Sequence, residues 1–275
     1  MADGFEQLVF SGGGIRCFWH GGFMAEVGQQ LDLVPSRVSG VSGGALSAAA
    51  WIGGCEDDLR VLMKDAFAMN SSNVEREASN FTPHQELYRA VVESTLDNVS
   101  LERIAEGPQY EISLAIPLSG LPAWVSTVIF GFLYKLDEHV RSTPHLVLTR
   151  RLGLKAIRVD ARQAARENQL IDLICAAATI PPIFDVPRWD GKRVIDGGMF
   201  DKAPIPSTDS GRTLVLMTSR YRNLPRAIDD REYVQPRSEV AASKIDFRNP
   251  EDVDDTWKQG ARDGEAWLVQ RQKSS

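Results

Sequence analysis

The stretch Gly40-Val41-Ser42-Gly43-Gly44 decides the fold class and has the pattern Gly-x-Ser-x-Gly. It lies between a short apolar segment and a helix-like run, where a nucleophile elbow turns from a strand into a helix. In such a turn the flanking glycines, Gly40 and Gly44, leave room for a tight backbone that presents the Ser42 hydroxyl outward. The helix dipole at this point favours developing negative charge. A glycine-rich turn with an N-cap serine fits the pentapeptide alone equally well, so other motifs must decide.

A glycine-rich loop follows the first apolar run of the chain, residues 5–10. Its sequence is Ser11-Gly12-Gly13-Gly14-Ile15-Arg16, and backbone N–H groups in such a loop can bind an anion. A dinucleotide fingerprint needs a third glycine where this chain has Cys17, and a phosphate-binding P-loop needs Gly-Lys-Ser/Thr, which is absent. An oxyanion loop needs only bare N–H donors, and Gly13 and Gly14 suit that role.

The positions of the histidines argue against a triad in the order serine, acid, histidine. All four histidines precede the best acid candidate, Asp196. Asp196-Gly197-Gly198 follows a strand-like segment at 193–195, which puts a carboxylate on a sharp turn. A carboxylate can act directly as a general base where burial raises its pKa and it reaches the serine hydroxyl. By itself, Asp-Gly-Gly is more typical of a hairpin turn.

Strand-like and helix-like segments alternate along the chain, which predicts an α/β fold with a parallel sheet covered on both faces. We expect strands at 5–10, 38–41, 110–117, 155–160, 193–196 and 213–218. We expect helices at 16–31, from 45 to about 51, and at 57–69, 82–96, 170–178 and 254–270.

Taken together, the motifs resemble those of the patatin-like phospholipase family. The resemblance spans most of residues 5–267. The matching blocks stand in the family's order: the loop Gly12–Arg16, the elbow Gly40–Gly44, a small-residue helix and proline turn at Ala176–Phe184, the acid motif Asp196–Gly198, the following segment Asp201–Pro206, and a closing helix from Asp254 to Trp267.

The resemblance implies one domain over residues 1–275, with a three-layer α/β fold whose mostly parallel sheet carries helices on both faces. It implies a serine lipid acyl hydrolase of the phospholipase A or lysophospholipase type, which works through an acyl-enzyme and needs no cofactor or metal. Two alternatives stay open: a lipid acyltransferase, and a catalytically weak lipid-binding or regulatory module.

Carried over residue by residue, the resemblance assigns roles to the quoted positions. Ser42 would be the nucleophile and Asp196 its base. The oxyanion hole would be formed by the loop glycines Gly12, Gly13 and Gly14. Arg16 would support the loop or bind an anion there. The elbow and the acid turn would depend on Gly40, Gly44, Gly197 and Gly198.

The middle of the chain contains 23 residues without a charge, Ile112 to Tyr134. Prolines interrupt its first half, and the uniform remainder from Ala123 to Tyr134 is too short to cross a bilayer upright. A buried core helix is one interpretation. Its aromatic residues favour the other, an apolar cap at about 117–145 that touches lipid beside the site. The basic run that follows, Arg141 to Arg166, suits either an anionic membrane surface or a face paired within the fold.

The composition excludes several function classes. A formal net charge of −6 and a pI near 5.4 do not indicate nucleic-acid binding. The three cysteines, Cys17, Cys55 and Cys175, have no C-x-x-C spacing, which suits a reducing compartment and gives no metal site. The N-terminal residues lack the pattern of a secretory signal. We therefore expect a cytoplasmic protein in peripheral contact with membrane phospholipid, and no sequence signature reveals an activator or self-association.

Overall fold

The computed structural model describes most of the chain. The described residues are 4–70, 72–73, 83–117, 143–145, 155–181, 184–222, 224 and 230–274. The expected cap at about 117–145 therefore lies almost entirely outside the described residues.

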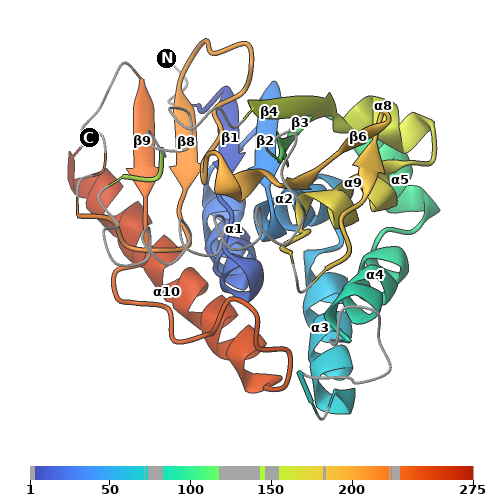
Figure 1. The fold of residues 1–275 in the computed structure, drawn as a ribbon. Coiled ribbons are helices and arrows are strands. Elements are labelled where there is room, and N and C mark those ends of the chain that lie inside the picture. The colour runs from blue at the N-terminus through green and yellow to red at the C-terminus, as the bar shows by residue number, and fades with distance from the viewer. Residues whose placement is uncertain are drawn as a thin grey trace.

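A seven-stranded, mostly parallel sheet forms the centre of the molecule (Figure 1). Its main path has the order β4-β3-β2-β1-β8-β9, and β7 pairs with β3 off this path. The pairs within β3-β2-β1-β8-β9 are parallel, whereas β4 and β7 each pair antiparallel with β3. The strands are β1 (Gln7–Phe10), β2 (Arg37–Val41), β3 (Gln109–Ile116), β4 (Lys155–Asp160), β7 (Ile195–Asp196), β8 (Thr213–Leu216) and β9 (Arg231–Val234).

Helices of very different length surround the sheet. They are α1 (Phe18–Gln30), α2 (Gly43–Gly53), α3 (Glu56–Met69), α4 (His84–Thr95), α5 (Asn98–Glu106), α8 (Ala161–Arg166), α9 (Leu170–Ala177) and α10 (Glu251–Ser274). Two 3₁₀ turns, η1 (Gly14–Cys17) and η2 (Gly197–Met199), and a small hairpin of β5 (Arg188–Trp189) and β6 (Lys192–Arg193) complete the described elements. The predicted α/β fold with a mostly parallel sheet is confirmed.

The two faces of the sheet are covered differently in the described part. Alternate residues of β1 point to opposite faces because the side-chain period of a strand is two. Leu8 and Phe10 join the main core with the helices, whereas Val9 joins a smaller cluster with Ala203 and Ile205. The described helices thus line the face of Leu8, and an extended segment after the acid motif covers the face of Val9.

Glycines let α10 lie very close to α1, and Figure 1 shows the two helices side by side. A Cβ atom on Gly22 would lie 1.9 Å from the carbonyl oxygen of Trp257, and one on Gly260 would lie 2.2 Å from that of Trp19. The Trp19 indole N–H also donates a hydrogen bond of 2.8 Å to Asp263. The long C-terminal helix is thereby fixed against the helix that follows the glycine loop.

Most predicted elements are confirmed, with a few differences. The expected strand at 193–196 is split, since Lys192–Arg193 belongs to the small hairpin and only Ile195–Asp196 joins the main sheet. The helices α5 and α8 and the edge strand β9 were not predicted. In the part of the chain that the structure describes, no helix is both long and apolar enough to span a membrane.

Candidate active site

Ser42 occupies the tip of a strained turn between β2 and α2. Its backbone has φ 55° and ψ −138°, a conformation that residues with a side chain rarely adopt. The flanking glycines are required by close packing. A Cβ atom on Gly40 would lie 2.8 Å from the Cα atom of Ala45, and one on Gly44 would lie 2.3 Å from the carbonyl oxygen of Ser11. The Gly-x-Ser-x-Gly pattern therefore forms an elbow, as the sequence predicts.

The acid turn brings Asp196 to the Ser42 side chain. The carboxylate of Asp196 accepts a hydrogen bond of 2.7 Å from the Gly198 N–H, and it lines the same small cavity as Ser42, whose hydroxyl lowers the pKa of the carboxyl. The Asp196 N–H donates to the carbonyl oxygen of Thr179 at 2.8 Å, so the end of the small-residue helix holds the acid strand. A Cβ atom on Gly197 would lie 2.2 Å from the Ser113 carbonyl oxygen, which explains the glycine at this crossing of β3.

Burial sets the protonation behaviour of Asp196. Its side chain is almost inaccessible, at 4% exposure, and burial raises the pKa of the carboxyl to about 6. The Ser42 hydroxyl, the hydrogen bond from the Gly198 N–H and the positive charge of Lys244 act in the opposite direction. The carboxyl is consequently ionised near neutral pH and still basic enough to accept a proton from an alcohol.

The glycine loop offers fewer donors than its sequence suggests. The Gly12 N–H donates to the carbonyl oxygen of Lys202 at 2.9 Å, so it is already engaged within the fold. All three loop glycines line a small cavity together with Ser42 and Asp196. The engaged N–H group of Gly12 argues against its expected place in the oxyanion hole, which leaves Gly13 and Gly14 as the candidate donors of the loop.

Packing explains why Gly13 and Gly14 carry no side chain. A Cβ atom on Gly13 would lie 2.3 Å from the Thr218 hydroxyl oxygen, and Gly14 has a positive φ of 57°. A Cβ atom on Gly14 would also lie 2.0 Å from the carbonyl oxygen of Lys244. The loop backbone is therefore held against two distant segments, which fixes the direction of its N–H groups.

Arg16 supports the loop from outside the cavity. Its Nε atom donates a hydrogen bond of 2.8 Å to the carbonyl oxygen of Ala242, and its Nη1 atom is buried without a partner among the described residues. Arg16 does not line the small cavity around Ser42. Of the two roles expected for it, the structure favours support of the loop, and its charge acts on the site from a distance.

Two lysines that sequence reasoning missed line the same small cavity, Lys202 and Lys244. Lys202 is 8% exposed, and burial, with smaller effects of Lys244 and Arg16, lowers its pKa to about 7. Lys202 lies six positions after Asp196 in the segment that follows the acid motif, which is a signal that could have found it. Lys244 lies in a loop without a motif, so only the fold reveals it.

A second, apolar pocket extends from Ser42 in another direction. It is lined at one end by Ser42, Gly43 and Cys17, and Ile180 belongs to both pockets. Further along, its lining is made almost entirely of apolar side chains from α2, α3, α4 and the loop before α10: Leu46, Leu59, Met63, Tyr88, Ile245 and Phe247. Such a pocket suits a hydrocarbon chain rather than a polar group.

The histidines take no part in the described site. His20 is fully buried against Phe10, and burial lowers its pKa to about 3, so its imidazole is neutral. His145 contacts Asp201 and the hydroxyl of Tyr233. The absence of a histidine beside Ser42 among the described residues agrees with the argument from chain order.

The cysteines are buried or half-buried thiols. Burial and the nearby charge of Asp196 raise the pKa of Cys17 far above its usual range, so this thiol next to the glycine loop is not a reactive thiolate. Within the described residues, no group of three or more potential metal ligands comes together.

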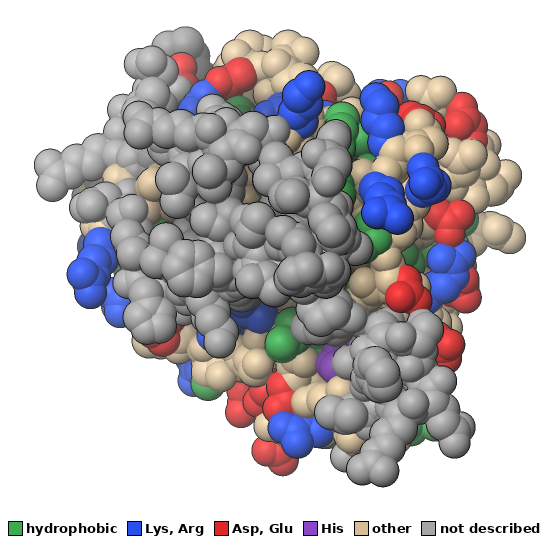
Figure 2. Space-filling view, viewed as in Figure 1, with side chains coloured by type: hydrophobic (Ala, Val, Ile, Leu, Met, Phe, Trp, Pro, Cys, Tyr) green, Lys and Arg blue, Asp and Glu red, His purple; other side chains and the backbone are tan. Residues whose placement is uncertain are grey.

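Several arginines of the basic run at 141–166 make contacts within the fold. Arg158 forms an ion pair with Glu111, and Arg162 and Arg166 both donate to the carbonyl oxygen of Ala105. On the face shown in Figure 2, charged side chains of both signs are interspersed over the described surface. For these arginines the structure favours pairing within the fold over a free basic surface.

A glycine loop and a serine elbow beside a mostly parallel sheet are features of α/β enzymes that transfer acyl groups. The family model described as patatin-like phospholipase matches residues 8–209, and the chain belongs to this family. It is accordingly a lipid acyl hydrolase in the general sense that the family defines.

Comparison with solved structures agrees at the level of the fold. VipD from Legionella pneumophila superposes with a TM-score of 0.51 and 11% sequence identity, covering 97% of this chain and 67% of VipD. No curated protein matches the sequence.

Proposed function

We propose that the protein cleaves acyl esters of membrane phospholipids, as a phospholipase A or lysophospholipase, through a dyad of Ser42 and Asp196. The observation that carries this proposal is the buried carboxylate of Asp196, which lines the same small cavity as Ser42 at the tip of the elbow and whose pKa the Ser42 hydroxyl lowers. A serine hydroxyl is a weak nucleophile until a base removes its proton, and Asp196 is the titratable group in contact with it.

The steps follow from this geometry. Asp196 takes the proton as the Ser42 oxygen attacks the ester carbonyl, and the N–H groups of Gly13 and Gly14 stabilise the resulting oxyanion. The carboxylic acid then returns the proton to the leaving lipid alcohol, which leaves an acyl-enzyme on Ser42. Water, activated by the same carboxylate, attacks this ester and releases the fatty acid. No metal or organic cofactor is required for any step.

Two lysines support a phospholipid rather than a neutral acylglycerol as the substrate. Lys202 and Lys244 line the cavity that also contains Ser42. A phosphodiester next to the ester would meet the charge of Lys244 and would favour the protonated form of Lys202, whose pKa burial lowers to about 7. A neutral lipid would gain neither interaction. Peripheral contact with a membrane would bring the substrate to the site, and the segment at about 117–145 is the part of the chain that we propose for it.

The direct test uses vesicles of phosphatidylethanolamine and phosphatidylglycerol, with released fatty acids and lysolipids followed by mass spectrometry. Wild-type protein is expected to release both, and the Ser42→Ala variant is expected to release neither. Ser36→Ala is the matched control, because this serine is exposed just before β2 and its hydroxyl donates to the Glu6 carbonyl oxygen, away from the site. Release that survives Ser42→Ala rejects the nucleophile.

The same assay separates hydrolysis from acyl transfer. With an added lysophospholipid, an acyltransferase would form a new diacyl lipid at the expense of free fatty acid, because an alcohol replaces water in the second step. A protein that binds the vesicles but converts no lipid under any condition would instead be the regulatory module.

The activity is expected to depend on pH through Asp196. The base must be ionised, so kcat/KM should rise with pH and reach half of its plateau near the carboxyl pKa of about 6. Lys244 lowers that pKa, and the Lys244→Gln variant should therefore shift the midpoint to higher pH. Rates from pH 4.5 to 8 on a soluble ester, with product measured by chromatography, test both statements.

Lys192→Gln is the control for this profile, since Lys192 lies exposed in the small hairpin and outside both pockets. An unchanged midpoint in the Lys244→Gln variant would show that the charge of Lys244 does not act on the base.

A further inference from the structure

Two cavities meet at a pair of aromatic rings, Tyr88 and Phe184. These two residues line both the apolar pocket that begins at Ser42 and a larger outer cavity of about 450 Å³. Apart from Ser42, Ser47 and Lys244, apolar side chains and glycines line the inner pocket, with the Tyr88 ring at its far end. The outer cavity is bordered by the ion pair of Arg89 and Asp172, with a distance of 2.7 Å. The ring pair therefore stands between an apolar and a polar space.

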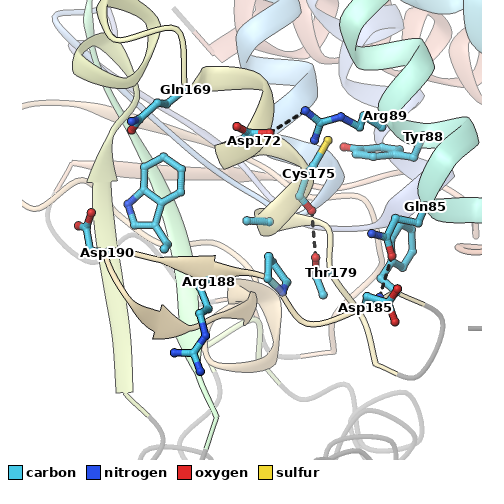
Figure 3. A pocket seen from close by; sticks show the side chains of 14 residues that line it. Gln85, Tyr88, Arg89, Gln169, Asp172, Cys175, Thr179, Asp185, Arg188 and Asp190 are labelled. Carbon is cyan, nitrogen blue, oxygen red and sulfur yellow. Dashed lines mark hydrogen bonds and ion pairs between the residues drawn. The ribbon is translucent and has the colours of Figure 1, made fainter. Parts of the chain in front are cut away.

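Figure 3 views this boundary from the outer cavity. Tyr88 and Arg89 come from α4, and Asp172 and Cys175 come from α9. The rings of Tyr88 and Phe184 meet edge to face, with centroids 6.4 Å apart and an interplanar angle of 89°. Each of the two residues is only 7% exposed, so the rings are packed rather than loosely placed.

Within the described part of the chain, packing holds the Tyr88 ring in place. Its hydroxyl is buried and has no hydrogen-bond partner among the described residues. Although buried hydroxyls are usually satisfied, no described residue anchors this one. The bulk of the two rings therefore makes the wall, and we expect a ring without the hydroxyl to make it equally well.

We propose that the Tyr88–Phe184 pair forms the end wall of the acyl-chain pocket and so sets the longest acyl chain that the enzyme accepts. This inference rests on the proposed function, because it takes the chain attached at Ser42 to enter the apolar pocket. A chain that reaches the rings cannot continue, since beyond them it would enter the polar outer cavity. Removing the Phe184 ring frees the volume that the ring fills, so that a chain could extend by a few carbons before it meets the outer cavity.

Fatty-acid binding by the inactive Ser42→Ala protein tests the wall without relying on catalysis. Octanoate, dodecanoate and hexadecanoate are titrated by calorimetry below their micelle concentrations. Each is titrated into the Ser42→Ala protein and into the double variant that also carries Phe184→Ala. Burying about two further methylenes contributes roughly 1.6 kcal/mol, or about tenfold in affinity. The added Phe184→Ala change should raise the affinity ratio of hexadecanoate to octanoate by at least that factor.

The matched control is Tyr88→Phe, which keeps the ring and removes the unpartnered hydroxyl, and it should leave the ratio unchanged. Phe184→Leu is the second variant should Phe184→Ala fail to fold, and a smaller shift in the same direction is expected. An unchanged ratio in the folded variants, or no binding of any fatty acid, overturns the end wall. If the affinity ratio of hexadecanoate to octanoate shifts as expected but the wild-type protein hydrolyses no lipid, the end wall stands and the proposed function is rejected.

In the active protein, the same changes should move the preferred chain length in ester hydrolysis. Phe184→Ala should lower the rate on butyryl esters relative to hexadecanoyl esters, and Tyr88→Phe should retain the wild-type order. Identical chain-length profiles for wild type and Phe184→Ala would count against the proposal as strongly as the binding result.

Discussion

Replacing Ser42 by alanine is expected to lower kcat/KM for ester hydrolysis by about 10⁴-fold or more, the size of effect seen when a serine nucleophile is removed. The loss should lie in kcat, because the apolar pocket and the two lysines that would bind the substrate remain. The elbow backbone should persist, since alanine and serine meet the same strain at φ 55°. Initial rates on a soluble ester, combined with a thermal melt, separate lost chemistry from lost folding.

Asp196→Asn should cause a loss of similar size, for a different reason. Asparagine keeps the shape of the side chain and can still accept the hydrogen bond from Gly198, but it cannot take the Ser42 proton. Because the two residues act in one step, the double variant should be no worse than Ser42→Ala alone. Losses that multiply in the double variant would mean that Ser42 and Asp196 act independently.

The elbow and the acid turn could be predicted from sequence because their close backbone contacts require glycines within short motifs. Gly40 contacts Ala45 within the same turn, whereas Gly44 and Gly197 contact the distant carbonyl oxygens of Ser11 and Ser113. In each case the requirement is visible in the sequence as a glycine, even where the partner is not. The absence of a histidine after Asp196 then indicated an acid as the base. These arguments need only local spacing and chain order, which a sequence supplies.

Other parts of the site depend on contacts between distant segments, and no local pattern encodes them. The hydrogen bond from the Gly12 N–H to the Lys202 carbonyl oxygen argues against Gly12 as an oxyanion donor, although all three loop glycines look equivalent in sequence. Lys244 reaches the site from the loop before α10. Tyr88 and Phe184 come from the two sides of a pocket that exists only after α4 and α9 pack together.

The two helices that the sequence analysis does not predict, α5 and α8, do carry a sequence signal at their N-termini. Asp97 caps α5 by accepting a hydrogen bond from the Ser100 N–H, and Asp160 caps α8 in the same way. An aspartate at the N-cap position is a helix-start signal, so both helices could have been found by attention to caps. The edge strand β9 is short and polar, and its partner β8 defines it more than its own residues do.

The largest effect on stability is expected from Gly22→Ala in the interface between α1 and α10. The new Cβ atom would lie 1.9 Å from the carbonyl oxygen of Trp257, and that contact is with backbone, so no side-chain rotation can relieve it. The two helices must move apart, which should lower the free energy of unfolding by about 3 kcal/mol or more. Urea denaturation followed by circular dichroism measures the change.

Gly28→Ala provides the matched control within the same helix. No atom lies within 4 Å of the point that a Cβ atom on Gly28 would occupy, and the residue is exposed near the end of α1. Alanine is favoured over glycine in a helix by about 1 kcal/mol, so this variant should be slightly more stable than wild type. The same glycine-to-alanine substitution at two positions six residues apart is thus expected to change the free energy of unfolding in opposite directions. A stabilising Gly22→Ala would contradict the close approach of α10 to α1.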